Sequence, residues 1–160
     1  MLAILALGGN LGDPREQINE AIASLNAHEA IKVTATSPLV ESFALTEAGI
    51  DETAPRYLNG VVEVETTLNP EDLLLATRAI ELAAGRTRDV RWGPRTLDID
   101  IITFGDVHQH TEDLTLPHPR AHERAFVLTP WSLMQPDAVI PGRGKVAELA
   151  KSYPGEVWEA

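Results

Sequence analysis

Apolar residues along the chain follow two periods. Four segments are either continuously apolar or alternate between apolar and polar residues, which is typical of strands buried on both faces or on one. Two segments between them repeat apolar residues every three or four positions, as Ile18, Ile22 and Leu25 illustrate, and predict helices. The predicted strands span residues 2–7, 31–43, 57–66 and 97–104, and the predicted helices span 14–27 and 70–84.

Capping signals agree with the helix boundaries. Asp13-Pro14 and Asn69-Pro70 each place a capping side chain before a proline at the first helical position. Gly85 suits the end of the second helix, because glycine readily adopts the left-handed conformation that ends many helices. Both helices are therefore expected to begin and end close to these residues.

The order of elements is β-α-β-β-α-β, the ferredoxin-like arrangement. It predicts an α+β fold with a mostly antiparallel sheet, both helices on one face, and the other face free to carry a site. Segments 8–13 and 44–55 are interpreted as a turn and a surface loop, and the second strand as bulged near Ser37-Pro38. A C-terminal extension is expected to contain a short strand after Gly105-Asp106, a helix from about Pro119, a turn that Pro130 starts or kinks, and a short helix at 145–152.

Length and composition narrow the functional class. A chain of 160 residues predicts a single domain, 1–160. The absence of cysteine excludes disulfides, thiolate zinc sites and cysteine nucleophiles. The apolar run at 2–7 is too short for a membrane span and has no signal-peptide layout, so a cytoplasmic protein is expected. The net charge of −11 argues against nucleic-acid binding, whereas a local arginine cluster favours a small anionic ligand. The cluster consists of Arg78, Arg86, Arg88, Arg91 and Arg95.

Asp98 and Asp100 are the first candidates for chemistry. Side chains two apart on a strand point to the same face, about 6.6 Å apart along the strand, whereas Leu97, Ile99 and Ile101 point toward the helices. Paired carboxylates suit Mg²⁺, which takes one or two of them together with substrate phosphates. A solvated edge strand is the alternative. The nearby arginines favour the metal interpretation, because guanidinium groups bind phosphate oxygens.

Other candidates leave two interpretations open. Asn59 lies among apolar strand residues, where either a ligand or a neighbouring backbone group can satisfy its amide. His118, between two prolines, either contacts a phosphate or carries a proton, or it is a turn histidine that caps the next helix. Trp92 and Phe126 suit either stacking on a heterocycle or plain packing.

Taken together, these motifs resemble the 6-hydroxymethyl-7,8-dihydropterin pyrophosphokinase family of folate biosynthesis. They occur in the family's order over residues 7–126, and the run from Arg91 to Asp100 is the most specific. The motifs are Leu7-Gly8-Gly9-Asn10-Leu11-Gly12-Asp13, Tyr57-Leu58-Asn59, Gly85-Arg86, Arg91-Trp92-Gly93-Pro94-Arg95-Thr96-Leu97-Asp98-Ile99-Asp100, and Leu116-Pro117-His118-Pro119 with Arg124 and Phe126. The resemblance implies a ferredoxin-like enzyme that transfers pyrophosphate from ATP to the pterin hydroxymethyl group and releases AMP.

The resemblance also implies a role for each site residue. Two Mg²⁺ ions would be held by Asp98 and Asp100, and Arg86 and Arg95 would stabilise the transferring group. Tyr57 and Phe126 would sandwich the pterin, with Asn59 at its edge and Trp92 closing over it. The residues implied to bind ATP are Glu81, Arg88, Arg91, Trp92, Ile101, Thr115, His118 and Arg124. The expected partners are ATP and the pterin alone, without nucleic acid or membrane, for a monomeric enzyme.

The sequence departs from the family pattern in three places. Residues 41–45 lack a Thr-Pro pair often found there, and the loop 86–92 is one residue shorter than in some members. Pro119 stands where some members have a nucleotide-contacting tyrosine. Two other classes stay open from the residues alone. One is a metal-dependent phosphohydrolase that uses the same carboxylates, and the other is a ferredoxin-like ligand-binding or regulatory domain.

Overall fold

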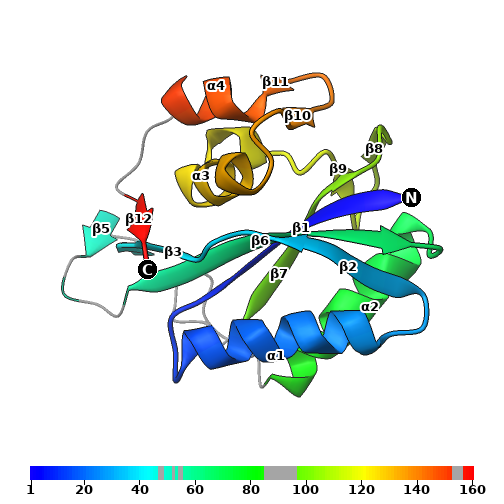
Figure 1. The fold of residues 1–160 in the computed structure, drawn as a ribbon, viewed down its shortest axis with the longest axis horizontal. Coiled ribbons are helices and arrows are strands. Elements are labelled where there is room, and N and C mark those ends of the chain that lie inside the picture. Colours follow the sequence, from blue (N-terminus) through cyan, green and yellow to red (C-terminus); the bar gives the residue numbers. More distant parts are fainter. Residues whose placement is uncertain (47–48, 52, 54–55, 85–96, 153–156) are drawn as a thin grey trace.

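The computed structural model describes residues 1–46, 49–51, 53, 56–84, 97–152 and 157–160. Within these residues, one six-stranded sheet lies between two layers of helices (Figure 1). The strands of this sheet are β1 (Leu2–Gly9), β2 (Ile31–Thr36), β3 (Val40–Ser42), β6 (Tyr57–Thr66), β7 (Asp98–Phe104) and β12 (Val157–Glu159). Three small hairpins join β4 (Ala44–Thr46) to β5 (Gly49–Asp51), β8 (Gln109–His110) to β9 (Thr115–Leu116), and β10 (Val139–Ile140) to β11 (Gly144–Lys145).

The strand order confirms the ferredoxin-like prediction. Strands run β12-β3-β6-β1-β7, with β2 also paired to β6, and each of these pairs is antiparallel. The helices are α1 (Pro14–Ala27), α2 (Pro70–Ala83), the 3₁₀ helix η1 (Ala121–Glu123), α3 (Ala125–Met134) and α4 (Val146–Ser152). The predicted helix starts are confirmed: Asp13 accepts a hydrogen bond from the Glu16 backbone N–H at 3.1 Å, and Asn69 accepts one from that of Asp72 at 2.8 Å. Gly85 lies outside the described residues.

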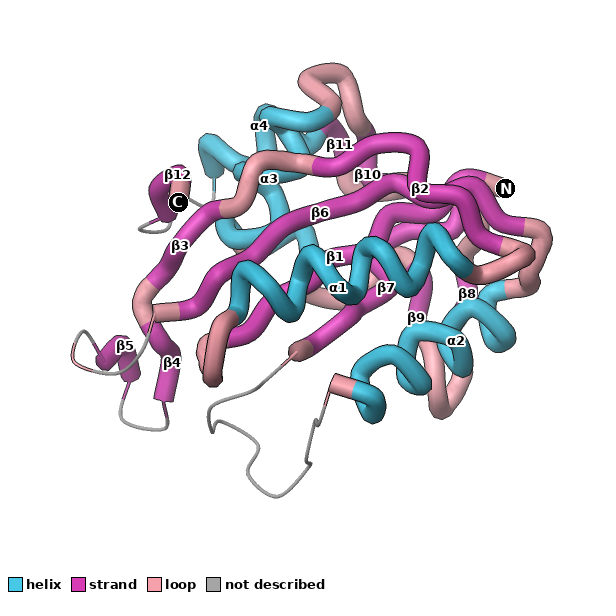
Figure 2. Tube along the Cα trace, turned by 60° about the horizontal axis from the view of Figure 1, so that its bottom comes forward, coloured by secondary structure: helices cyan, strands magenta, loops and turns pink. Residues whose placement is uncertain are grey.

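The first face of the sheet is covered by α1 and α2, as predicted (Figure 2). Leu5 and Leu7 of β1, Val62 of β6 and Ile99 of β7 pack there with Ile18, Leu25 and Leu73 of the helices, all of them buried. Burial of apolar surface contributes about 25 cal/mol per Å², so this cluster supplies much of the stability of the fold. It also holds β7 against β1 and keeps the alternate residues of β7 on the opposite face.

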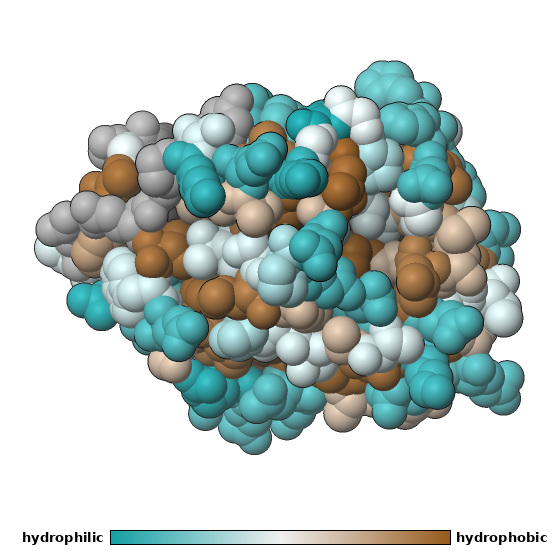
Figure 3. Space-filling view, turned by 45° about the horizontal axis from the view of Figure 1, so that its top comes forward, coloured by the Kyte–Doolittle hydropathy of each residue, from teal (hydrophilic) through white to brown (hydrophobic). Residues whose placement is uncertain are grey.

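The sequence led us to expect a free second face. This prediction is wrong for part of the face, because α3 packs across it. Ile4, Val61 and Ile102, from the three central strands, form a second buried cluster with Leu128 and Trp131 of α3. The outer surface of this layer mixes hydrophobic and hydrophilic residues (Figure 3). Apolar residues lie on most sides of α3 and do not form one stripe along it. The sequence pattern therefore did not indicate that this helix packs against the sheet.

Smaller differences have local causes. Strand β1 continues through Gly9, so Gly8 and Gly9 belong to the sheet and not to the turn. The predicted second strand is broken between β2 and β3, where the Ser37 side chain accepts a hydrogen bond from the Val61 backbone N–H at 2.8 Å. Pro38 follows and has no N–H to continue the ladder. Part of the predicted loop 44–55 forms the β4–β5 hairpin, and Pro130 lies inside α3.

Candidate functional site

The half of the second face that no described helix covers is organised by the register of three strands. Gly8 of β1 lies directly opposite Asn59 of β6 on one side and Asp98 of β7 on the other. Directly opposite residues in antiparallel pairs project to the same face. The predicted pterin residue and one of the predicted metal ligands therefore share one cross-strand row. With neighbouring strands about 4.8 Å apart, the Cα atoms of Asn59 and Asp98 are about 10 Å apart.

Asp98 and Asp100 alternate with buried residues, as predicted from the period of two. Both aspartates are half-buried, whereas Leu97, Ile99 and Ile101 are at most 4% exposed in the helix-side core. Within the described residues, no group of three or more carboxylates and histidines converges as a closed metal site. A pair of carboxylates is nevertheless the donor set that fits Mg²⁺, which completes its shell with waters and substrate phosphates. The residues present therefore fit a magnesium site that is completed by a phosphorylated ligand.

Glu81, predicted to bind ATP, lies behind this carboxylate pair. It is 4% exposed, and its Oε2 accepts a hydrogen bond of 2.8 Å from the backbone N–H of Ile99. Ile99 stands between Asp98 and Asp100, so this bond joins α2 to the centre of the pair. A buried charge-assisted bond is stronger than a neutral one. Glu81 thus holds the backbone between the two aspartates in place.

Asn59 carries the buried amide group of this row. Its side chain is 8% exposed, and within the part of the chain that the structure describes no hydrogen bond reaches its amide group. Leaving a buried amide without a partner costs about 1–3 kcal/mol, so such groups in folded proteins commonly face a ligand or a bound water. The alternative interpretation, a bond to a neighbouring backbone group, is not what the described residues show. The amide offers both donors and an acceptor to a ligand edge.

Aromatic and cationic side chains lie at the start of β6 and at the start of α3. Tyr57 begins β6 and is half-buried, and Phe126 near the start of α3 packs partly against the second cluster. The Arg124 guanidinium lies 5.6 Å from the Phe126 ring centroid. A cation over an aromatic face stabilises both side chains, so the start of α3 presents a fixed aromatic–arginine pair.

His118 lies in a cationic environment. Burial, together with Arg124, Arg143 and Arg120, lowers its pKa from 6.5 to about 4, so the ring is neutral at pH 7. Its Nδ1 accepts a hydrogen bond of 3.2 Å from the Arg120 backbone N–H, which leaves the proton on Nε2. This bond stabilises the turn before η1, but η1 itself begins without a side-chain cap, so the predicted helix cap at His118 is not formed. The neutral ring can also donate a hydrogen bond through its Nε2–H.

The remaining predicted residues divide into two groups. Ile101 has its side chain in the helix-side core and is 3% exposed, which leaves only its backbone for contact with a nucleotide. Thr115 contacts His110 Nδ1 at 3.2 Å in the β8–β9 hairpin. Five predicted residues lie outside the described residues: Arg86, Arg88, Arg91, Trp92 and Arg95.

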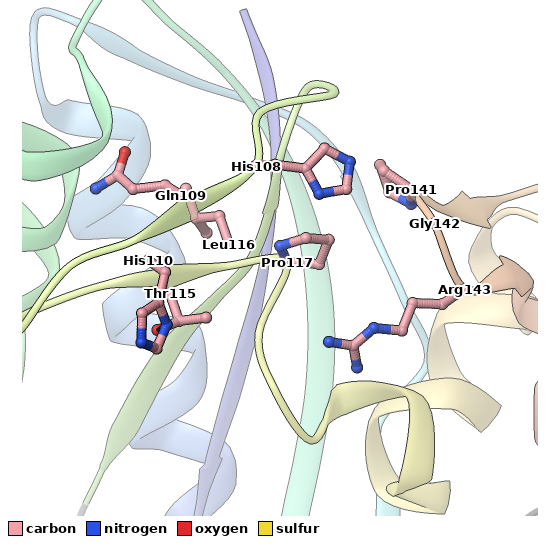
Figure 4. Close-up of a pocket in the computed structure, with 9 residues that line it drawn as sticks. All are labelled: His108, Gln109, His110, Thr115, Leu116, Pro117, Pro141, Gly142 and Arg143. Atoms are coloured by element: carbon pink, nitrogen blue, oxygen red, sulfur yellow. Dashed lines mark hydrogen bonds between the residues drawn. The ribbon is translucent and has the colours of Figure 1, made fainter.

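Thr115 also lines an open pocket of about 520 Å³ between the β8–β9 hairpin and the β10–β11 turn. The His108 ring points toward Pro141, and the Arg143 guanidinium points toward Pro117 (Figure 4). Neither Asp98 nor Asp100 lines this pocket. It therefore contains one predicted ATP-binding residue, Thr115, but not the carboxylate pair.

Sequence reasoning did not single out three candidate functional residues, Arg120, Arg143 and Gly8. Arg120 and Arg143 both act on His118, yet Arg143 is 25 positions away along the chain and only tertiary folding brings it close. Gly8 was interpreted as part of a turn. Its position directly after a continuous apolar run was a signal that the strand continues through it.

Comparison with known proteins identifies the family. A model of the 7,8-dihydro-6-hydroxymethylpterin-pyrophosphokinase (HPPK) family matches residues 4–136. The chain belongs to this family. The HPPK relatives include the 2-amino-4-hydroxy-6-hydroxymethyldihydropteridine pyrophosphokinase of Bacillus subtilis, which is 46% identical over 129 residues, or 81% of this chain and 75% of that protein. The enzyme of the same name from Pseudomonas aeruginosa is 43% identical over 152 residues, or 95% of this chain and 91% of that protein.

Solved structures agree on the HPPK fold. The crystal structure of Plasmodium falciparum HPPK-DHPS with pteroate superimposes with a TM-score of 0.71 at 16% identity. It covers 95% of this chain, and the chain spans 42% of that protein. The similarity to the HPPK family anticipated from the motifs is therefore confirmed, and the chain is an enzyme of the pyrophosphokinase class. Within the described residues, none of the helices combines the length and apolar character needed to cross a membrane.

Proposed function

We propose that this HPPK-family enzyme transfers the pyrophosphoryl group of ATP to the hydroxymethyl group of 6-hydroxymethyl-7,8-dihydropterin in folate biosynthesis. The observation that carries the proposal is the cross-strand row of Asp98, Gly8 and Asn59. It sets a carboxylate pair and an amide that has no partner among the described residues on one face, about 10 Å apart. A heterocycle bound at the amide end can extend its hydroxymethyl group toward phosphates bound at the carboxylate end.

The reaction exchanges a phosphoanhydride bond of ATP for a phosphoester bond to the pterin. The pterin hydroxyl oxygen forms a bond to the β-phosphorus of ATP and loses its proton, while the bond from the β-phosphorus to the α-phosphate bridging oxygen breaks. AMP leaves with that oxygen. The protein contributes positioning and charge stabilisation rather than a covalent intermediate.

Asp98 and Asp100 would hold Mg²⁺, two ions by family resemblance, and the ions neutralise phosphate charge when they are bound. The two aspartates fix the position of that charge because β7 is held on both sides. On one side β1 pairs with it, and on the other Glu81 accepts a hydrogen bond from Ile99. Arg86 and Arg95 would stabilise the transferring group, and Arg88 and Arg91 would hold the triphosphate.

Binding of the two substrates is assigned to opposite ends of the row. Tyr57 and Phe126 would lie against the pterin ring, Asn59 would bond its edge, and Trp92 would cover it. His118 would donate a hydrogen bond from its Nε2–H to a phosphate oxygen, and Arg124 would place a positive charge beside it. Thr115 and the backbone of Ile101 would line the nucleoside end of the site, and Glu81 would support ATP binding from behind the carboxylate pair through its hydrogen bond to Ile99. We further propose a monomeric cytoplasmic enzyme that binds neither nucleic acid nor membrane.

The test is product analysis of the purified protein with ATP, Mg²⁺ and the hydroxymethyl pterin. The expected products are AMP and the pterin diphosphate in equal amounts, with AMP release dependent on both pterin and Mg²⁺. Inorganic phosphate released from ATP alone would favour a phosphohydrolase. Binding of ATP without any turnover would favour a regulatory domain. Either of these results would contradict the proposed transfer.

A further inference from the structure

Gly8 occupies the centre of the row that joins the two ends of the proposed site. It is buried in β1, between Asn59 of β6 and Asp98 of β7. An alanine Cβ placed on Gly8 would lie closer than 3.0 Å to Asn59 Oδ1 and 3.2 Å from Asn59 Cγ. The space that a side chain at position 8 would fill is therefore the space that the Asn59 amide occupies.

The backbone does not require glycine at this position. Gly12, Gly49 and Gly105 have positive φ angles, which favour glycine, whereas Gly8 is not among the residues with positive φ. It is a regular strand residue with partners on both sides. A glycine inside a strand weakens it, and it often marks a point where another group approaches closely. Here that group is the side chain of Asn59.

We propose that Gly8 is a positioning residue for the pterin. Its missing side chain lets the Asn59 amide lie across β1 on the side of Asp98, so the bound heterocycle faces the phosphates. This inference rests on the proposed function, because it takes Asn59 as the pterin contact. A larger residue at position 8 would push the flexible end of Asn59 away, and the amide would lose its alignment with the donor and acceptor edge of the ring.

Gly60 provides a matched control in the adjacent strand. An alanine Cβ there would also come closer than 3.0 Å to a side-chain end, Leu39 Cδ2. Gly60 lies opposite Leu7, which belongs to the helix-side core, so this crowding is on the other face of the sheet. Gly60→Ala thus imposes a similar steric load without touching Asn59. It should reproduce the cost in stability of an added methyl group and leave the kinetics for both substrates unchanged.

The experiment is a double-mutant cycle of Gly8→Ala and Asn59→Ala, with kcat, KM for the pterin and KM for ATP measured for each variant. Gly8→Ala is expected to lower kcat/KM for the pterin about 10-fold, the scale of one lost hydrogen bond, with KM for ATP unchanged. In the Asn59→Ala background, Gly8→Ala should have no further effect, because the atoms it would displace are gone. Additive losses, or an unaltered Gly8→Ala enzyme, would overturn the inference.

Two further results are also decisive. If Gly8→Ala alone fails to fold, recovery of folding in the Gly8→Ala/Asn59→Ala enzyme supports the steric coupling, and failure to recover overturns it. If wild-type protein releases no AMP in response to the pterin, the proposed function falls and this inference falls with it. An active wild-type enzyme with an additive cycle overturns only the role of Gly8.

Discussion

The second face of the sheet has two halves that use the same three strands for opposite purposes. Under α3, the strands present Ile4, Val61 and Ile102, which are buried with Leu128 and Trp131. Beyond α3, they present Gly8, Asn59, Asp98 and Asp100. Only a few positions along each strand separate core from site. Because the packed residues and the polar residues belong to the same three strands, packing under α3 also holds the polar side chains in position. A site for phosphoryl transfer needs its charges held in this way.

The change from one half to the other follows the edge of a single helix. Where α3 covers the sheet, polar residues would cost free energy, so the facing positions are apolar. Beyond α3 the facing positions are polar, and the proposed function assigns Asn59 and the aspartates there to the two substrates. Strand β7 also carries a bulge opposite Ile4 and Leu5, at the extra residue Ile102, beyond which Thr103 pairs with Ile4 and Phe104 returns to the helix-side core. The bulge marks the boundary between the two halves.

Removing a carboxylate from the polar half should have the largest effect. Asp100→Ala is expected to lower kcat by roughly 100- to 1000-fold or more, because the charge that holds phosphate-bound Mg²⁺ is lost. The free energy of unfolding should change little, since Asp100 is only half-buried. Steady-state AMP release and thermal unfolding measure the two quantities. An enzyme that keeps most of its turnover would show that the polar half is not the reaction site.

The matched change in the apolar half is Ile102→Ala, two positions further along the same strand. Ile102 is 1% exposed, so its truncation should lower the free energy of unfolding by about 2–5 kcal/mol. Activity per folded molecule should stay within about threefold, a difference of well under 1.4 kcal/mol. Chemical denaturation and kinetics below the melting temperature test this. A loss of turnover as large as that of Asp100→Ala would erase the distinction between the two halves.

His118 should make stability depend on pH. Its pKa is about 4 in the folded protein, against the ordinary histidine value of 6.5 in an unfolded chain, so between these values the unfolded chain binds more protons. The free energy of unfolding therefore falls as pH decreases from 6.5 to 4, by up to about 3 kcal/mol. His118→Gln should remove this part of the slope. Denaturation midpoints across that range, compared between wild type and variant, measure it, and identical slopes would contradict the buried neutral histidine.

The smallest effect is expected behind the carboxylate pair. Glu81→Ala leaves the Ile99 backbone N–H without its carboxylate partner and should destabilise the protein by about 1–3 kcal/mol. Glu81→Gln keeps an acceptor oxygen and is the control. Because β7 loses one of its two supports, Glu81→Ala should also weaken activation by Mg²⁺. A Mg²⁺ titration of activity checks this, and an unchanged titration would mean that β1 alone positions the aspartates.

The sequence predicted those features that depend on near neighbours. The period of two placed Asp98 and Asp100 on the face opposite Ile99, and the caps at Asp13 and Asn69 marked both helix starts. Residue roles at the site came from family resemblance rather than from spacing, and they remain predictions. The ferredoxin-like order followed from the sequence of elements alone.

Features set by distant contacts could not be predicted. Gly8 matters because of its register with Asn59 and Asp98, which lie 51 and 90 positions later in the chain. The environment of His118 depends on Arg143, and the strand containing Trp158 adds to β3 at the edge of the sheet. The cover over half of the second face was missed because α3 lacks a one-sided apolar stripe.

The most direct test is a crystal structure of the enzyme with the hydroxymethyl pterin, Mg²⁺ and an ATP analogue that cannot transfer its pyrophosphoryl group. We expect hydrogen bonds from the Asn59 amide to the pterin edge, and Mg²⁺ at about 2.0–2.1 Å from oxygens of Asp98 and Asp100. The pterin hydroxyl should point at the β-phosphorus. Substrates bound instead in the pocket between the β8–β9 hairpin and Arg143, with the Asn59 amide still unbonded, would contradict the assignment of the polar half as the active site.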